Sequence, residues 1–177
     1  MIRLLRERTA CFTGHRTVPP RGASELTESL EKQIMFLYEK GITDYLAGGA
    51  KGFDALAAAV VLKLRDVSCP DIRLILVLPC PDQYKTWNEL DIALHREIRN
   101  RASGIITLAD EYYDGCMLAR NRYMVDNSLV CIAYYNASRI GGGTYHTMTY
   151  CQRQGVLTVN LYDTLNIPDN PITFPED

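Results

Sequence analysis

Two glycine-rich turns carry the residue types that would bind an anion. The first, Gly48–Asp54, follows an apolar run and leads into apolar residues at helical spacing. A strand, a glycine turn and a helix in that order bring free backbone N–H groups and the positive end of the helix to one point, which suits a phosphate. Gly141–Thr144 repeats this pattern before a predicted helix over Tyr145–Arg153. The alternative is that the glycines only make tight turns, because glycine loops of this kind are common.

Polar and aromatic side chains near the turns would complete such a site. Asp54 is placed either to cap the first turn of its helix or to accept a hydrogen bond from a ribose hydroxyl. His15 and Arg16 follow the first predicted strand, where they would contact an anion or lie in a solvated loop. Arg120, predicted in the first turn of a helix, has the planar guanidinium that suits phosphate, although spacing alone also fits an ordinary exposed arginine. Trp87 is the only tryptophan of the chain, and either a core or lid role or stacking on a base fits its position.

The elements that must position these residues alternate along the chain. Predicted strands cover Thr9–Phe12, Ile42–Ala47, Ile72–Leu78, Gly104–Leu108, Ser128–Tyr135 and Val156–Leu161. Helical patterns lie between them, including one that begins near Ser24 and stops at Gly41, and one with Trp87 in its first turn. This alternation predicts an α/β fold with a parallel sheet covered by helices on both faces. Right-handed connections would then place every strand-to-helix loop, and so both glycine turns, at one edge of the sheet.

Composition limits the classes to which the protein belongs. A chain of 177 residues predicts one domain over residues 1–163, followed by a proline-containing tail over residues 164–177 that packs on the surface. No apolar run is long enough for a membrane span, and the charged N-terminus does not fit a signal peptide. The six cysteines are scattered, which predicts reduced thiols, neither a disulfide nor a metal site, and a cytoplasmic location.

Five motifs taken together resemble the YpsA-like family of the SLOG superfamily. They are Thr13–Arg16, Gly48–Asp54, Trp87–Glu89, Arg120–Asp126 and Gly142–Thr144, and the resemblance spans roughly Thr9 to Leu161. It implies a Rossmann-like three-layer sandwich that binds a nucleotide or a derivative such as ADP-ribose or NAD. The superfamily includes cytokinin-activating phosphoribohydrolases and the single-strand DNA-binding protein DprA. YpsA-like proteins are linked to bacterial cell division or stress, with no agreed reaction.

The residues expected to bind the ligand come from all five motifs. They are Thr13, Gly14, His15, Arg16, Gly48, Gly49, Gly52, Asp54, Trp87, Arg120, Asn121, Gly142, Gly143 and Thr144. Four of them, Gly48, Gly49, Gly142 and Gly143, are predicted to line the main cleft. Replacing Arg120 with alanine is expected to weaken nucleotide binding and to leave the fold intact.

The resemblance leaves the activity open, because Thr147 occupies the position of the phosphoribohydrolase glutamate. Hydrolysis of an N-glycosidic bond needs a carboxylate close by, and no spacing selects Asp54, Glu89 or Asp126 as a substitute. We therefore expect a regulatory nucleotide-binding module first and a nucleotide hydrolase second. A single-strand nucleic-acid binder ranks last, because a net charge of −2 gives no overall basic surface. The sequence also leaves open whether the chain forms a homo-oligomer.

Overall fold

Short runs of buried residues form a six-stranded sheet in which every neighbouring pair is parallel. The computed structural model describes residues 2–164. The strands are β1 (Thr9–Gly14), β2 (Asp44–Ala47), β3 (Arg73–Leu78), β4 (Gly104–Thr107), β5 (Val130–Tyr134) and β6 (Leu157–Asn160). All residues of β2 and β5 are buried, as expected for central parallel strands covered on both faces. The predicted α/β fold is confirmed.

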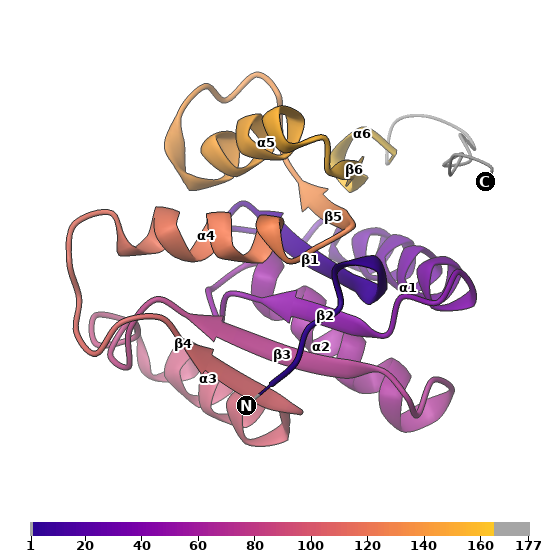
Figure 1. The fold of residues 1–177 in the computed structure, drawn as a ribbon, viewed down its shortest axis with the longest axis horizontal. Coiled ribbons are helices and arrows are strands. Elements are labelled where there is room, and N and C mark those ends of the chain that lie inside the picture. Colours follow the sequence, from indigo (N-terminus) through magenta and orange to yellow (C-terminus); the bar gives the residue numbers. More distant parts are fainter. Residues whose placement is uncertain (1, 165–177) are drawn as a thin grey trace.

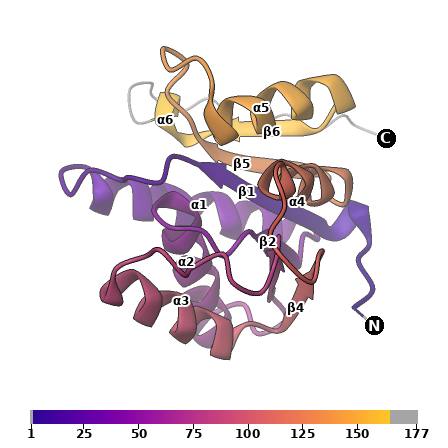
Figure 2. The ribbon, with the colours of Figure 1, turned by 90° about the vertical axis from the view of Figure 1, so that its left-hand side faces the viewer.

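Helices cover both faces of the sheet and make three layers (Figures 1 and 2). One face carries α1 (Ala23–Glu39), α2 (Phe53–Val67) and α3 (Glu89–Arg101), and the other carries α4 (Cys116–Asp126) and α5 (Gly142–Gln154). A short 3-10 helix, η1 (Arg6–Arg8), precedes β1, and α6 (Leu161–Thr164) follows β6. Leu26, Leu30, Ile34 and Leu37 form the buried stripe of α1, at the spacing that one helix face requires. The three-layer Rossmann-like sandwich is therefore present.

The order of the strands creates a switch point at the centre of the sheet. The order is β4-β3-β2-β1-β5-β6, so the chain first adds strands on one side of β1 and then returns to add β5 on the other side. The loops that follow β1 and β5 consequently lead to helices on opposite faces. In sheets of this kind, ligands bind at the carboxyl ends of the strands where the order reverses.

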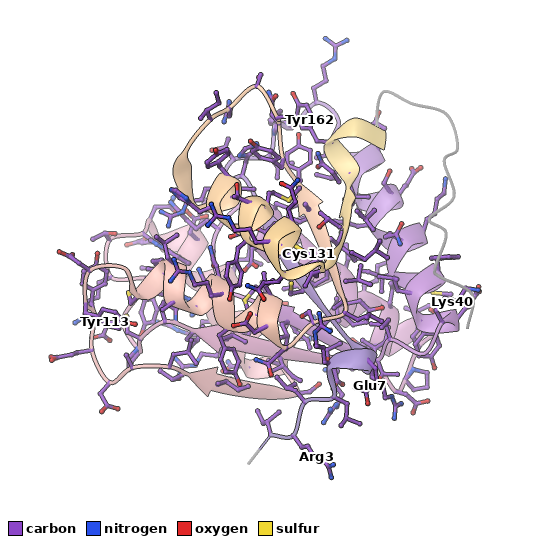
Figure 3. The ribbon with its side chains drawn as sticks, turned by 45° about the horizontal axis from the view of Figure 1, so that its top comes forward. Arg3, Glu7, Lys40, Tyr113, Cys131 and Tyr162 are labelled. Carbon is purple, nitrogen blue, oxygen red and sulfur yellow. The ribbon has the colours of Figure 1, made fainter. Side chains whose placement is uncertain are left out.

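The layer between the sheet and the helices α4 and α5 contains three of the six cysteines. Cys11 of β1 and Cys131 of β5 are direct partners in the parallel register, and Cys151 of α5 belongs to the same apolar cluster. Figure 3 labels Cys131 among the side chains near α5. All six cysteines are buried and unpaired.

Two details of the chain differ from the sequence prediction or lie beyond it. Trp87 precedes α3 instead of occupying its first turn, because Asn88 caps the helix and its side chain accepts a hydrogen bond from the N–H of Asp91. The predicted tail over residues 164–177 lies outside the described residues except for Thr164, which ends α6. No helix within residues 2–164 is long and apolar enough to cross a membrane.

The end of β1 gives a test of the packing between the sheet and α2. A Cβ atom on Gly14 would lie 2.4 Å from Cδ1 of Phe53, a side chain with no exposed surface. We expect Gly14→Ala to lower the free energy of unfolding by about 1–3 kcal/mol, because the buried ring must move. Gly143→Ala is the matched control, since the nearest atom to its added Cβ would be 3.8 Å away. Urea unfolding measures both, and equal stabilities of the two variants would contradict the packing described.

Candidate functional site

A cleft of about 350 Å³ opens at the switch point. The residues predicted from the sequence that line it are Thr13, Gly14, His15, Arg16, Gly48, Asp54, Arg120, Asn121, Gly142, Gly143 and Thr144. The structure thus brings both glycine turns to one hollow, as the parallel sheet requires. Gly49, Gly52 and Trp87 line a separate cavity between α2 and α3. The expectation that Gly49 lines the same cleft as Gly48 is therefore wrong. The first glycine turn runs between the two hollows, so Gly48 lines one of them and Gly49 the other.

Asp54 holds the first glycine turn from inside. Its Oδ1 accepts a hydrogen bond from the N–H of Gly48 at 3.0 Å, and its Oδ2 accepts one from the N–H of Ala50 at 2.7 Å. The side chain points back to the turn, so it does not cap the first turn of α2. Burial raises the pKa of the Asp54 carboxyl, and the charge of Arg120 and the N–H groups of the turn oppose that effect. Both oxygens are thus occupied by the protein itself.

Arg120 supports the same turn from the opposite side of the sheet. Its Nη1 donates to the carbonyl oxygen of Gly48 and, at 3.4 Å, to that of Val77. The residue is 5% exposed and lies in the second turn of α4, which begins at Cys116. The expectation of an exposed arginine in a first turn is wrong. The reason for expecting alanine at this position to leave the fold intact is thereby removed. Because α4 begins one turn before Arg120, the long side chain of Arg120 extends beneath the first glycine turn.

A chain of hydrogen bonds continues from Arg120 to the second glycine turn. Nε of Arg120 donates to Oδ1 of Asn121 at 2.8 Å, and Nδ2 of Asn121 donates to Oγ1 of Thr147 at 2.9 Å. Oγ1 of Thr147 in turn donates to the carbonyl oxygen of Gly143 at 2.8 Å. We call these three side chains the Arg120 network. It connects the two glycine turns across the cleft and explains why Thr147 is buried.

Gln83 and His95 support the first turn on the α3 side, and sequence reasoning missed both. Nε2 of Gln83 donates to the carbonyl oxygens of Gly48 and Gly49, both at 3.1 Å. Nδ1 of His95 donates to the oxygen of Gly49, also at 3.1 Å. A Cβ atom on Gly49 would lie 2.8 Å from Nε2 of Gln83, so these supports need glycine there. No local spacing links these residues to the turn, because they approach it from a distant part of the chain.

Two arginines face the cleft without protein partners for their guanidinium groups. Arg16 follows β1, Arg139 follows β5, and both are exposed and line the cleft. Neither forms an ion pair or a side-chain hydrogen bond within residues 2–164. They are the charged groups of the cleft that remain available for an anion.

Carboxylates for bond cleavage are missing from the cleft lining. Asp54 is the one acidic residue that lines the cleft, and its oxygens are occupied by the turn. Asp126 lies outside the lining and accepts a hydrogen bond from Tyr150, while Glu89 is exposed at the start of α3. Within the described residues, no group of three or more His, Cys, Asp or Glu side chains is arranged to hold a metal ion.

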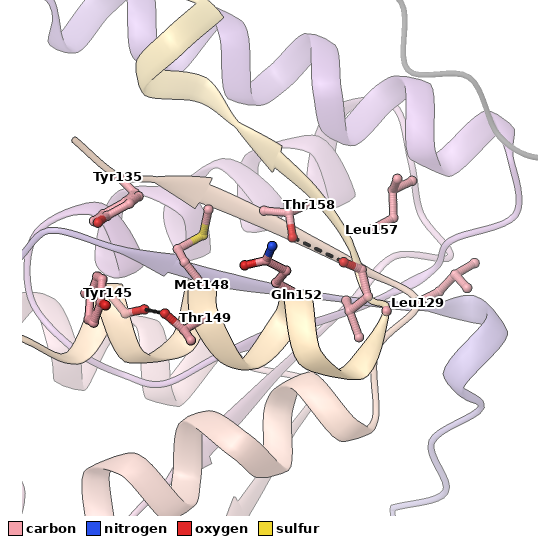
Figure 4. A pocket seen from close by; sticks show the side chains of 10 residues that line it. Leu129, Tyr135, Tyr145, Met148, Thr149, Gln152, Leu157 and Thr158 are labelled. Carbon is pink, nitrogen blue, oxygen red and sulfur yellow. Dashed lines mark hydrogen bonds between the residues drawn. The ribbon is translucent and has the colours of Figure 1, made fainter. Parts of the chain in front are cut away.

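A larger hollow lies elsewhere and contains none of the predicted site residues. It measures about 940 Å³ and runs between α5 and the strands β5 and β6 (Figure 4). Met148, Val156 and Leu157 are among its apolar lining residues. The switch-point cleft is therefore not the largest hollow of the molecule, contrary to the expectation of a main cleft there.

The buried position of Arg120 predicts a structural cost for its removal. Arg120→Met should lower the free energy of unfolding by about 3 kcal/mol, because it leaves buried carbonyls and the Asp54 carboxylate without their cation. Arg122→Met is the matched control, since Arg122 is exposed on the same helix and only lies over the Tyr150 ring; it should change stability by less than about 1 kcal/mol. Chemical denaturation measures the free energy of unfolding of both variants. If Arg120→Met were as stable as the wild type, Arg120 would not support the turn as described.

His15 predicts a specific loss of stability in acid. Its Nε2 accepts a hydrogen bond from the N–H of Asn136 at 2.9 Å, and burial together with the charge of Arg139 lowers its pKa. Because the pKa of His15 is lower in the folded than in the unfolded protein, its contribution to stability is fully present above the unfolded pKa of about 6.5. This contribution is lost as the pH falls through the lower pKa of the folded protein. His15→Gln keeps an acceptor that does not titrate. The variant should therefore lose less stability than wild type between neutral pH and about pH 5; equal losses would count against the hydrogen bond.

Comparison with known proteins agrees with this architecture. The model of a family described as the YspA SLOG family matches residues 20–163. The UPF0398 protein BH1768 of Halalkalibacterium halodurans is 28% identical over 76% of this chain and 71% of its own length. The SPbeta prophage-derived protein YoqJ of Bacillus subtilis is 26% identical over 70% of this chain and 81% of its own.

Two solved structures share the fold at low sequence identity. One is the DNA processing protein A of Helicobacter pylori, described for its single-stranded DNA binding mode, with a TM-score of 0.61 and 18% identity. The match covers 86% of this chain and 64% of that one, less than two thirds of its length. The other is the X-ray structure of TM1055, a structural genomics target, with a TM-score of 0.54 and 15% identity over 89% of this chain and 79% of its own.

Proposed function

This chain belongs to the YspA SLOG family, and from that premise we propose that it is a cytoplasmic nucleotide-binding protein. Its switch-point cleft binds the phosphate groups of a nucleotide derivative such as ADP-ribose. The protein does not convert this ligand into a product. The observation that carries the proposal is the pair of arginines, Arg16 and Arg139, which face a cleft built from two glycine turns and have no partners of their own. Phosphate is one of the anions that such planar, paired donors suit, and the free N–H groups of a glycine turn before a helix favour it further.

The start of α5 supports an anion at the same place. Gly141, the residue before the helix, has no side-chain cap, and the first turn of α5 contains no acidic residue. The first N–H groups of a helix lack partners within the helix, and the helix dipole favours negative charge beside them. Gly142 and Gly143 are exposed and line the cleft, so a phosphate can approach this backbone closely.

The lack of a free carboxylate favours binding over hydrolysis. Thr147 occupies the position of the phosphoribohydrolase glutamate, and it belongs to the Arg120 network. Asp54 is buried with both oxygens engaged. A transition state with oxocarbenium character would find no free carboxylate to stabilise it in this cleft. We therefore expect a nucleotide 5′-monophosphate incubated with the protein to release no free base.

Calorimetric titration with ADP-ribose tests the proposal. Arg139→Ala should weaken binding about tenfold, because it removes a charge-assisted hydrogen bond at an exposed site. The matched control is Arg153→Ala, which removes an exposed arginine of α5 outside the cleft lining and should leave the affinity unchanged. Absence of binding to the wild-type protein, or equal losses in the two variants, would overturn the proposal.

A groove beside the cleft favours a second candidate, single-stranded nucleic acid. The groove measures about 260 Å³, lies between α4 and α5, and shares Leu118 and Asn121 with the cleft lining. Arg122, His146 and Arg153 line it together with Tyr145 and Tyr150. Basic and aromatic side chains along one track are what a single strand requires. Together with the fold shared with a DNA-binding protein, this local patch weakens the expectation that nucleic acid is an unlikely partner.

The same control variant separates the two candidates. A fluorescent oligothymidylate should bind more weakly to Arg153→Ala than to wild type, and its affinity should fall steeply with added salt because phosphate contacts release counterions. If anisotropy shows no binding at low salt, the nucleic-acid candidate is excluded and the ADP-ribose result stands alone.

A further inference from the structure

The hollow between α5 and the strands β5 and β6 lies at the edge of the sheet (Figure 4). It measures about 940 Å³, and none of its described lining residues is charged. Gln152 of α5 lines one side of it, and Thr158 of β6 lines the other. Its apolar lining residues include Leu129, Met148, Val156 and Leu157. Exposed apolar surface of this extent marks a place where another segment packs. We call this hollow the edge hollow.

The strand β6 is the outermost strand on this side of the sheet. Within the described residues it pairs with β5 alone, so its other edge presents backbone N–H and C=O groups that have no strand beside them. Proteins usually pair or cover such an edge, because it is otherwise a template for association with other chains. A single segment lying along β6 would cover both the edge and the edge hollow.

The chain itself continues from this place. The helix α6 (Leu161–Thr164) directly follows β6, and residues 165–177 come after it. A chain that turns back after α6 runs antiparallel to β6, which is the direction that a short connection allows. Ile172 is eight residues beyond Thr164, which corresponds to a reach of up to about 27 Å. The four residues of β6 extend over about 13 Å, so the reach is sufficient.

The sequence Pro171-Ile172-Thr173-Phe174-Pro175 has the pattern of an edge strand. Alternate side chains of a strand point to opposite faces, so Ile172 and Phe174 would share one face. Alternate residues also direct their N–H groups to opposite edges. If Ile172 and Phe174 direct theirs toward β6, the two prolines, which have no N–H, take positions that face away from the sheet. Those are the positions that an edge strand allows to proline.

We propose that residues 171–175 pair with β6 as an added antiparallel edge strand and place the side chains of Ile172 and Phe174 over the edge hollow. This contact of the chain with itself is independent of any ligand in the switch-point cleft. Its consequence lies in α5, because Tyr145 and Met148 line the edge hollow while the first residues of the same helix line the cleft. The added strand thus fixes the helix that carries the second glycine turn.

Hydrogen exchange of the full chain, read by mass spectrometry of the peptide that contains β6, tests the proposal. Phe174→Asp brings a charge to an uncharged hollow, so β6 should exchange at least about tenfold faster than in wild type. Thr173→Asp is the matched control, since Thr173 lies on the other face of the added strand, and it should leave the exchange unchanged. Equal exchange of β6 in wild type and Phe174→Asp, or equal acceleration by both substitutions, would overturn the proposal.

A pair of proline substitutions tests the backbone pairing. Ile172→Pro removes an N–H that donates to β6 and should also accelerate the exchange of β6 about tenfold, whereas Thr173→Pro removes an N–H that faces away and should not. Equal effects of the two prolines would show that the segment does not pair with β6. Sedimentation identifies the source of the strand: a wild-type dimer that Phe174→Asp dissociates would place a second copy of the chain on this edge. Either result would refute the proposal.

Discussion

A buried guanidinium under a glycine turn is the constraint on which the rest of this cleft depends. Burying a cation is costly unless its donors are satisfied, and Arg120 meets the cost with the carbonyls of Gly48 and Val77 and the side chain of Asn121. The close approach also explains the residue type above it. A Cβ atom on Gly48 would lie 2.1 Å from Nη1 of Arg120, so the turn and the arginine require each other.

The supports of the first turn come from both faces of the sheet. Arg120 reaches it from α4, His95 reaches it from α3, and Asp54 holds its N–H groups from α2. The Arg120 network then carries the connection on to Gly143 at the start of α5. A backbone held in this way has its shape before any ligand arrives, and that preorganisation lowers the entropy cost of binding. The charge buried beneath the turn is thereby used for shape, while the guanidinium groups of Arg16 and Arg139 stay unpaired in the cleft lining.

The first glycine turn separates the switch-point cleft from the cavity between α2 and α3. Because the turn passes between them, Gly48 faces one hollow and Gly49 the other, while Asp54 lines both. A residue that alters the turn therefore alters both hollows. Thr147 shows how one side chain can join two elements at the cleft: its hydroxyl links Asn121 of α4 to the carbonyl oxygen of Gly143 in α5. Function in such folds depends on the residues placed at the switch point.

The sequence by itself determined the elements and their class, because apolar periodicity and glycine turns are local signals. The strands and helices, the parallel sheet and the meeting of Gly48 with Gly142 at one edge followed from alternation and connection rules. What the side chains do was decided by tertiary structure. Arg120 and Gly48 are 72 residues apart in the chain, and His95 and Gly49 are 46 apart, so no spacing rule could pair them. Spacing along a helix says which face a side chain occupies, but the helices packed around the sheet decide whether that face meets water, a backbone carbonyl or a cavity. For this reason Arg120, an arginine expected at the surface, is buried. For the same reason Trp87 lines the cavity between α2 and α3, although it was expected beside a ligand in the cleft.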